Sequence, residues 1–345
     1  MNDAGRVAVV SGSVGAGHDG AARELVREFA AAGYATSRHD FLAMLGPRGG
    51  RALRAAYAAQ LRVAPGSWGW LLGNLSRHPG LTTGLAGFIA RVAARRLRAA
   101  LDPQPAAVVS TYPLASQALG YLRRRGELNV PVITYLTDLS VHRLWVAPGV
   151  DRHLALHEVA AAQARALGAA RVEVVRPVVR PDFATAAPAR LPVRGPVALV
   201  VAGSWGVGEV AAAAAEIAAT GLATPVTVCG HNAELRRRIA GAGTGLALGW
   251  VDDMPALVRA ANVVVQNAGG LTSLEAMSAG VPVLSYRCLP GHGTTNAAAL
   301  DEAGLASWVR HPADLAGALK VALADGPPAA VRALFAAGTP VGAVS

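Results

Sequence analysis

The sequence predicts an α/β protein of two domains, each built on a doubly wound parallel sheet. Short apolar runs rich in β-branched residues, such as those at 197–202 and 262–266, are typical of strands buried on both faces. Along the 345 residues these runs alternate with helical segments, the pattern of parallel sheets covered by helices. Five prolines between residues 177 and 196 interrupt the alternation and indicate a linker between the domains.

The first domain is expected to span residues 1–182. Its strands are predicted at 6–10, 107–111, 132–136, 151–156 and 171–175, with a helix at 19–32 and further helices ending at Gly126 and Leu167. The second domain, 190–320, has predicted strands at 197–202, 225–229, 245–249, 262–266 and 281–285. Residues 321–345 are expected to form a C-terminal helix and tail that pack back on the first domain.

The composition is that of a globular chain. Hydrophobic residues make up 52% of the sequence and charged residues 16%, so each domain has enough apolar side chains for a core. Cys229 and Cys288 have neither disulfide-framework nor metal-ligand spacing, which suits a reducing compartment. We recognise no signal peptide and no apolar run of about 18 residues, so we expect no membrane-spanning segment.

Positive charge is concentrated in the first domain. Residues 1–182 hold 22 basic and 12 acidic residues, a net charge of +10, whereas residues 183–345 hold 10 of each. The segment 41–101 carries nine arginines and no acidic residue. A local excess of this kind indicates an anionic partner, whereas a scattered excess would indicate only solubility.

A glycine-rich loop, GAGHDG at 15–20, is expected between the first strand and the first helix. It reads G-x-G-x-x-G, and Asp40 follows where a dinucleotide site places its ribose-binding acid, so NAD binding is one alternative. Two features oppose it: the first glycine comes several residues after the strand, and His18 occupies the turn that would contact the pyrophosphate. The imidazole of His18 is a candidate general base, and capping of the next helix is its structural alternative.

Asp138 follows the predicted strand at 132–136 and should therefore lie at the ligand-binding edge of the same sheet. It is a candidate to orient a base, to act as one or to bind an acceptor, and capping of the next turn is the alternative. His142 and Trp145 follow at short spacing. They either line an acceptor site or pack in the core.

The stretch 267–296 carries the clearest ligand-binding pattern of the second domain. Gly269 and Gly270 allow a close turn after the preceding strand, and a helix is expected to begin near Thr272. A helix N-terminus presents unpaired N–H groups and a positive dipole end, which suit a phosphate. Glu275 either completes a capping box with Thr272 or accepts the two hydroxyls of a ribose.

Seven motifs occur in a fixed order along the chain. They are SGSVGAGHDGAA (11–22), TDLSVHRLW (137–145), GSWGVG (203–208), CGHNAEL (229–235), GWVDDMPALVRAA (249–261), GGLTSLEAMSAGVPVL (269–284) and PGHGTTNAAALDEAGLA (290–306). Together they resemble the monogalactosyldiacylglycerol synthase family and its relative that adds N-acetylglucosamine to the lipid-linked peptidoglycan precursor. The resemblance runs from about residue 6 to about residue 310. It implies the GT-B architecture, in which two Rossmann-like domains face a central cleft.

In such an enzyme the C-terminal domain holds a UDP-sugar. By this resemblance Glu275 would hold the ribose, and the segment at Val251 would hold the uracil through backbone atoms. Ser204 would contact a phosphate, although a glycine-rich strand-to-helix turn is the alternative explanation. The predicted donor-binding residues are Gly17, Ser204, Val251, Gly269, Gly270, Leu271, Thr272, Glu275, His292 and Asn296.

The resemblance also assigns His18 to the catalytic centre. There it would take a proton from the acceptor hydroxyl as that hydroxyl attacks the anomeric carbon, with Asp138 as the second candidate for the base. The implied acceptor is a lipid hydroxyl, with diacylglycerol as the suggested case. No D-x-D motif occurs, and the spacing of Asp252 and Asp253 does not suit a metal clamp, so we expect no metal and no other cofactor.

Two departures from the family pattern lie close to the donor site. His292-Gly293 stands where the family usually has Gln-Glu, a pair that faces the hydroxyls of the donor sugar. Asn267-Ala268 stands where the family usually has Lys-Pro. The first departure leaves the identity of the sugar open, and the second affects a supporting contact.

Residues 46–100 do not follow the strand–helix alternation, and we expect them to contact an anionic membrane surface and the lipid acceptor. Arginines are attracted to anionic lipids, and tryptophan rings favour the headgroup region. A core-facing helix pair with a solvated arginine face is the alternative, and the donor motifs make nucleic acid a poor fit. The residues assigned to the acceptor and the membrane are Arg51, Arg54, Arg62, Trp68, Trp70, His142 and Trp145.

The sequence therefore predicts an inverting hexosyltransferase that uses a UDP-sugar and a lipid acceptor and lies on the cytoplasmic face of the cell membrane as a peripheral protein. A glycosyltransferase for a soluble natural product is one alternative. A UDP-N-acetylglucosamine 2-epimerase is another, but it needs more cleft carboxylates than this chain offers. A non-catalytic nucleotide-sugar-binding subunit is the third. The sugar and the oligomeric state stay open at this point.

Overall fold

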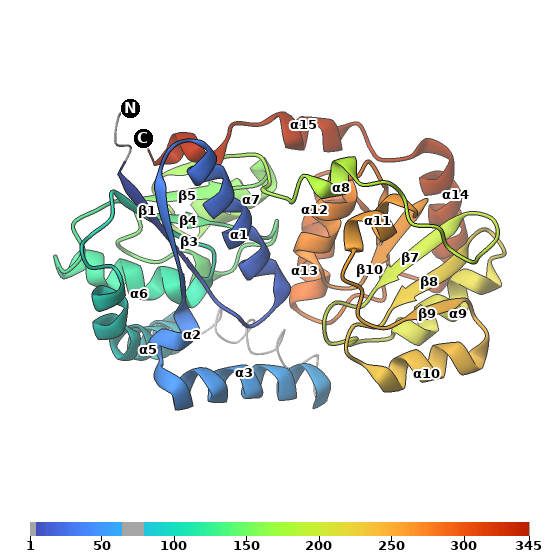
Figure 1. Ribbon diagram of the computed structural model, residues 1–345, viewed down its shortest axis with the longest axis horizontal. Coiled ribbons are helices and arrows are strands. Elements are labelled where there is room, and N and C mark those ends of the chain that lie inside the picture. Colours follow the sequence, from blue (N-terminus) through green and yellow to red (C-terminus); the bar gives the residue numbers. More distant parts are fainter. Residues whose placement is uncertain (1–4, 64–78, 345) are drawn as a thin grey trace. The chain divides into compact units, whose positions relative to one another are not determined.

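The computed structural model describes residues 5–63 and 79–344. The chain divides into two compact units, described separately below: unit 1 comprises Met1–Val178 and Ala336–Ser345, and unit 2 comprises Val179–Phe335. Each unit contains a six-stranded parallel sheet with helices packed on it (Figure 1). The predicted α/β class with two doubly wound sheets is therefore confirmed.

The sheet of unit 1 has the strand order β2-β1-β3-β4-β5-β6, and all neighbouring strands are parallel. Its central strands are apolar on both faces because helices cover both sides, and the valines of β1 are fully buried. The strands are β1 (Arg6–Ser11), β2 (Ala35–Asp40), β3 (Ala107–Ser110), β4 (Val132–Tyr135), β5 (Arg152–Ala155) and β6 (Val172–Val174). The helices are α1 (Ala16–Ala31), α2 (Phe41–Met44), α3 (Gly46–Val63), α5 (Pro79–Ala100), α6 (Pro113–Arg124), α7 (Glu158–Ala166) and the short 3-10 helix η1 (Arg143–Trp145).

Residues 46–100 form helices α3 and α5 wherever the structure describes them. Ala90, Ala93 and Leu97 of α5 are buried in the core of unit 1, so the second half of α5 agrees with the core-facing alternative. Phe88 and Val92 on the same helix are 59% and 42% exposed. One face of α5 thus presents apolar side chains to solvent, a feature of interaction surfaces.

The terminal segment Ala336–Ser345 belongs to unit 1 although it follows unit 2 in the sequence. Gly338 forms a parallel bridge with Val175, and its carbonyl accepts a hydrogen bond from the N–H of Arg176 at 2.8 Å. Farther along, Arg152 Nη1 donates to the carbonyl of Ala343 at 3.1 Å. The segment therefore continues the β6 edge of the sheet of unit 1.

The sheet of unit 2 has the order β12-β11-β10-β7-β8-β9, again with parallel neighbours. The chain builds one half outward from β7 and the other outward from β10, so the winding reverses between these two strands, where doubly wound sheets bind ligands. The strands are β7 (Val197–Val201), β8 (Thr224–Val228), β9 (Leu246–Leu248), β10 (Val263–Gln266), β11 (Val283–Tyr286) and β12 (Ser307–Val309). The helices are α8 (Asp182–Thr185), α9 (Val210–Ala219), α10 (Ala233–Ala242), α11 (Met254–Arg259), α12 (Gly270–Ser278), α13 (His292–Glu302), η2 (Pro312–Asp314), α14 (Leu315–Asp325) and α15 (Ala330–Ala336), and η3 (Pro340–Ala343) follows in unit 1.

All the strands expected from the sequence are present, with ends shifted by no more than two residues. β2 and β12 were not predicted because both are edge strands without a clear apolar run. β2 reads ATSRHD and contains no buried residue, and β12 has only three residues. The proline-rich segment before β7 is attached to unit 2, since the N–H of Ala189 donates to the carbonyl of Ala256 at 2.8 Å.

Candidate functional site

His18 lies in the first turn of α1 and not in the loop expected from the glycine pattern. Gly15 precedes this helix in extended backbone (φ −166°), and no side chain caps it, so the capping interpretation of His18 is wrong. The first turn is held by Asp19, whose carboxylate accepts hydrogen bonds from Ser11 Oγ at 2.6 Å and Ser13 Oγ at 2.9 Å. An acid in the first turn also favours an earlier helix start through the helix dipole.

The His18 ring is enclosed by two aromatic rings and one hydroxyl. Its centroid lies 5.2 Å from that of Tyr112, in an edge-on arrangement, and 5.8 Å from that of Trp145. Thr137 Oγ1 lies 3.2 Å from His18 Nδ1 and donates a hydrogen bond to Asp138 Oδ2, also at 3.2 Å. The structure thus brings both candidates for the base to one place at the edge of the sheet of unit 1, with Thr137 between them.

The acceptor candidates beside this ring differ in burial. Trp145 is 1% exposed and packs in a core cluster with Leu136 and Ala155, so its indole is a packing residue that also contacts the candidate base. His142 is partly exposed and precedes η1, and its ring centroid lies 6.1 Å from that of Trp145. Of these two side chains, only His142 combines exposure with proximity to the His18 group.

The glycine pattern of unit 1 does not form a dinucleotide site. Asp40 Oδ1 accepts hydrogen bonds from the N–H of Ser13 at 3.2 Å and the N–H of Leu42 at 3.0 Å. The carboxylate that would bind a ribose in the NAD alternative is therefore engaged in capping α2 and fixing the loop after β1. We find no structural support for the NAD alternative.

In unit 2, Asn267 joins three loops at the carboxyl ends of β7, β10 and β11. Its Nδ2 donates to the carbonyl of Val207 at 2.8 Å, and its own carbonyl accepts from the N–H of Leu289 at 2.8 Å. A Cβ added at Gly208 would lie 2.6 Å from Asn267 Nδ2, and one added at Gly293 would lie 2.6 Å from the Asn267 carbonyl oxygen. The two departures from the family pattern are therefore in contact, since a side chain at position 293 would displace the backbone at position 267.

Helix α12 begins at Gly270, two residues before the expected start, so the predicted capping box of Thr272 and Glu275 does not form. Its N-cap is Gly269, whose N–H donates to the side-chain oxygen of buried Gln266 at 2.7 Å. Glu275 lies in the second turn and is partly buried. The first turn, with the positive end of the helix dipole, comprises Gly270, Leu271 and Thr272.

His292 and Asn296 lie four residues apart on α13 and therefore face the same side of that helix. Asn296 is 1% exposed, and within the described part of the chain neither atom of its amide group has a hydrogen-bond partner. A buried polar group without a partner costs about 1–3 kcal/mol. Such an amide fits a site in which a polar ligand supplies the missing hydrogen bonds.

The remaining predicted donor residues lie on neighbouring loops, with one exception. The carbonyl of Ser204 accepts a hydrogen bond from the N–H of His231 at 3.1 Å, and the ring of His231 stacks on Trp250 with centroids 4.4 Å apart and planes at 5°. Val251 follows and is partly buried. Gly17 is the exception, since it lies in α1 of unit 1 whereas the other predicted donor residues belong to unit 2.

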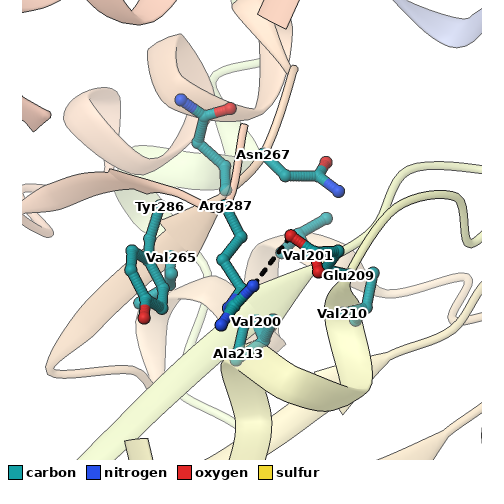
Figure 2. Close-up of a pocket in the computed structure, with 10 residues that line it drawn as sticks. Val200, Val201, Glu209, Val210, Ala213, Val265, Asn267, Tyr286 and Arg287 are labelled. Atoms are coloured by element: carbon teal, nitrogen blue, oxygen red, sulfur yellow. Dashed lines mark hydrogen bonds and ion pairs between the residues drawn. The ribbon is translucent and has the colours of Figure 1, made fainter. Parts of the chain in front are cut away.

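An ion-pair group that the sequence did not predict lies at the carboxyl ends of β7 and β11 (Figure 2). Arg287 follows β11 with φ +46°, the one positive φ at a non-glycine residue in the described ranges. Its guanidinium bonds Glu209 at 2.7 Å and Glu216 at 2.7 Å, and Tyr286 Oη donates to Glu216 at 2.6 Å. Figure 2 shows Arg287 reaching across a pocket toward Glu209. The seven-residue spacing of the two glutamates, which places them on one face of α9, is the only local signal of this group.

Ionisation in this group follows from these contacts. The hydrogen bond from Arg287 lowers the pKa of Glu216. The hydrogen bond to Glu216 raises the pKa of Arg287. Burial, reinforced by Glu216, raises the pKa of Tyr286 to about 12. All three side chains therefore keep their ordinary charge states near neutral pH, and the group fixes the start of the 287–291 loop to α9.

The predicted membrane residues are only partly covered by the structure. Arg51 and Arg54 are exposed on α3. Trp68 and Trp70 lie outside the described residues, as does the side chain of Arg62. No helix in the residues that the structure covers has both the length and the hydropathy needed to cross a bilayer.

Asp252 and Asp253, the adjacent acids considered for metal binding, both accept hydrogen bonds from neighbouring groups of the protein. Trp250 Nε1 donates to Asp252 at 2.9 Å, and Asp253 caps α11 by accepting a hydrogen bond from the N–H of Ala256 at 3.1 Å. Across residues 5–63 and 79–344, no cluster of three or more His, Cys, Asp or Glu side chains has the arrangement of a metal site.

Two doubly wound sheets, one carrying a candidate base and the other glycine loops and a helix start suited to a diphosphate, define the GT-B class. The comparisons with known proteins agree. Residues 18–176 match the family profile of monogalactosyldiacylglycerol (MGDG) synthase, and residues 183–325 match that of glycosyl transferases group 1. The chain therefore has the GT-B fold of glycosyltransferases, and the resemblance seen in the motifs is confirmed.

Among curated relatives, the processive diacylglycerol beta-glucosyltransferase of Bacillus subtilis (strain 168) is 26% identical over 239 residues, which cover 65% of this chain and 62% of that protein. The match thus spans less than two thirds of the relative's length. Among solved structures, the Streptomyces sp. SF2575 glycosyltransferase SsfS6, complexed with thymidine diphosphate, has a TM-score of 0.64 at 17% identity and covers 99% of this chain and 98% of its own. MurG of Acinetobacter baumannii has a TM-score of 0.55 at 17% identity, with coverages of 96% and 98%. These two likenesses concern the fold.

Proposed function

We propose that this protein transfers a hexose from a UDP-sugar to a lipid hydroxyl with inversion, and that diacylglycerol is the acceptor. The observation that carries the proposal is the His18 group: an imidazole enclosed by aromatic rings and joined through Thr137 to a buried carboxylate, within a domain that matches MGDG synthase. The named activity of the Bacillus subtilis relative, diacylglycerol glucosyl transfer, supports the choice of acceptor.

The donor is assigned to unit 2. The first-turn amides of α12 and the positive end of its dipole suit a diphosphate, and Glu275 one turn farther along suits the ribose hydroxyls. Asn296 offers an amide donor and an amide acceptor, buried and without partners in the described part of the chain, to the hydroxyls of a sugar. His292 lies on the same face of α13 and is the second candidate for contact with the sugar.

The reaction requires little beyond these groups. His18 takes the proton of the acceptor hydroxyl while the hydroxyl oxygen bonds to the anomeric carbon, and the bond from that carbon to the diphosphate oxygen breaks. One displacement inverts the configuration at the anomeric carbon. Backbone amides and the dipole of α12 stabilise the charge on the departing UDP, so we propose that no metal ion takes part.

The lipid acceptor implies work at a membrane surface, and we assign the protein to the inner face of the cell membrane as a peripheral protein. The exposed face of α5 supports this assignment, since Phe88 and Val92 alternate there with exposed Arg91 and Arg95. Apolar side chains enter the headgroup region while arginines pair with anionic lipids, each contributing about 1 kcal/mol.

The test is incubation of the protein with several UDP-sugars and diacylglycerol in anionic vesicles, followed by identification of the products. We expect a β-linked glycolipid from an α-linked donor. Hydrolysis of the donor or transfer only to soluble acceptors would favour a natural-product glycosyltransferase. Epimerisation of a UDP-sugar at C2 would indicate an epimerase, and tight UDP-sugar binding without turnover would indicate a non-catalytic subunit.

A further inference from the structure

We propose that Thr137 is a positioning residue that fixes the tautomer of His18, with the proton on Nδ1 and the basic lone pair on Nε2. The proposal rests on the proposed function, since it concerns how the candidate base is prepared for its role. From the sequence, His18 is the leading candidate for the base, and Asp138 is a candidate to orient the base, to act as one or to bind the acceptor. The structure places the hydroxyl of Thr137 3.2 Å from His18 Nδ1 and 3.2 Å from Asp138 Oδ2.

The direction of the two hydrogen bonds follows from a count of protons. A threonine hydroxyl has one proton to donate and lone pairs to accept with, and an ionised carboxylate only accepts. The bond between Thr137 and Asp138 therefore uses the threonine proton. Only lone pairs of Oγ1 are left for His18, so His18 Nδ1 must carry a proton to complete the second bond.

The consequence is a defined chemical role for each ring nitrogen. Which nitrogen of an imidazole is protonated is set by the partner of the other nitrogen, and a free ring exchanges between both forms. With Nδ1–H bonded to Thr137, Nε2 is the unprotonated atom that can take the acceptor's proton. Once His18 is protonated, Thr137 couples the imidazolium to the Asp138 carboxylate, which is 9% exposed.

The rest of the His18 residue is held independently of this bond. Thr111 Oγ1 donates to the His18 main-chain carbonyl at 3.1 Å, and the rings of Tyr112 and Trp145 flank the imidazole. Two threonines in the described part of the chain thus touch His18, Thr137 at the ring and Thr111 at the backbone. This pair provides a matched control, since the same Thr→Val change removes a different contact in each case.

The experiment records ¹⁵N–¹H correlations of the full chain labelled with ¹⁵N-histidine, and the His18 signals are those lost in His18→Gln. We expect Nδ1–H, with an unprotonated Nε2, in the wild-type protein, in Thr137→Ser and in Thr111→Val. In Thr137→Val the Nε2–H form should become populated. With turnover measured in parallel, kcat of Thr137→Val should fall about tenfold, the worth of one hydrogen bond, while KM for the donor stays the same and Thr137→Ser restores kcat.

An Nε2–H wild-type ring, or an unchanged tautomer in Thr137→Val, would overturn the proposal. The wild-type spectrum is decisive by itself should Thr137→Val fail to fold. Because the tautomer is measured without turnover, this result is independent of the proposed function. If the protein transfers no sugar but shows the expected tautomers, the positioning role of Thr137 is supported and the proposed activity is contradicted.

Discussion

Units 1 and 2 are built on the same kind of sheet but prepare their ligand-facing edges in different ways. In unit 1 the groups proposed to react are side chains, with His18, Thr137 and Asp138 contributed by α1 and by the segment after β4. In unit 2 the edge consists of glycine turns and helix starts, and Asn267 and Gln266 fix them through hydrogen bonds to backbone atoms. A base requires one side chain in one place, whereas a diphosphate can be held by several amides.

This difference means that equivalent substitutions should damage different properties. Changes at the edge of unit 1 should reduce the rate of the chemical step and leave the donor affinity unchanged. Changes at the edge of unit 2 should reduce the donor affinity. The predictions below use this contrast, beginning with the largest expected effect.

The largest effect should come from His18→Ala. Removal of a positioned base costs two to four orders of magnitude in turnover, so kcat should fall by about that factor. The measurement is steady-state glycolipid formation with saturating donor. The control is Thr227→Val in unit 2, because the Thr227 hydroxyl is buried and has no hydrogen-bond partner among the described residues. Near-normal turnover of the His18→Ala protein would indicate that Asp138, and not His18, is the base.

The two units should also differ in their response to acid. His153 on β5 is 2% exposed, and burial lowers its pKa to about 4, against the opposing effect of the Trp145 and Arg171 backbone. The folded pKa lies below the unfolded value of 6.5, so the contribution of His153 to stability is complete above pH 6.5 and is lost as the pH falls toward 4. The loss amounts to roughly 3 kcal/mol.

Unit 2 contains no buried histidine in its described residues, and its Glu216, with a pKa lowered by Arg287, loses its contribution only below about pH 4.5. Hydrogen exchange of the intact chain at pH 7, 6 and 5 should therefore show unit 1 weakening first. In His153→Gln this loss should disappear. Equal weakening of both units, or a loss that persists in the variant, would contradict this assignment.

The smallest effect is expected for Asn296→Leu, which should lower donor affinity without lowering the stability of the fold. Leucine keeps the same branched arrangement of heavy atoms and removes a buried amide that has no partner in the described part of the chain, so the melting temperature of the free protein should stay the same or rise. Donor affinity should fall several-fold because the sugar loses its hydrogen bonds. A lower melting temperature together with unchanged donor affinity would show that Asn296 serves the fold and not the donor.

The sequence predicted the parts of this protein that depend on local pattern. The buried strands are visible as apolar runs, and strand ends at one edge of a sheet are enough to bring His18 and Asp138 together. The starts of α1 and α12 were placed too late, because glycines that suggest a turn also tolerate helical backbone when neighbouring groups hold the first turn. Asp19 does so in α1, and Gln266 does so in α12.

The contacts that the sequence did not predict are long-range. Thr137 meets His18 across 119 residues, Asn267 meets Val207 across 60, and Arg287 meets Glu216 across 71. None of these residues has a local motif that indicates its partner. The exclusion of side chains at position 293 likewise depends on where the backbone of position 267 lies, and so the link between the two departures from the family pattern is visible only in the structure.

The division of roles between the units is tested most directly by calorimetric titration of UDP into Glu275→Ala, with His18→Ala as the matched control. We predict that Glu275→Ala weakens UDP binding at least tenfold, about the worth of one charge-assisted hydrogen bond, and that His18→Ala binds UDP like the wild type. Wild-type UDP affinity in a folded Glu275→Ala protein, or a loss of UDP affinity in His18→Ala, would contradict the assignment of the donor to unit 2 and the base to unit 1.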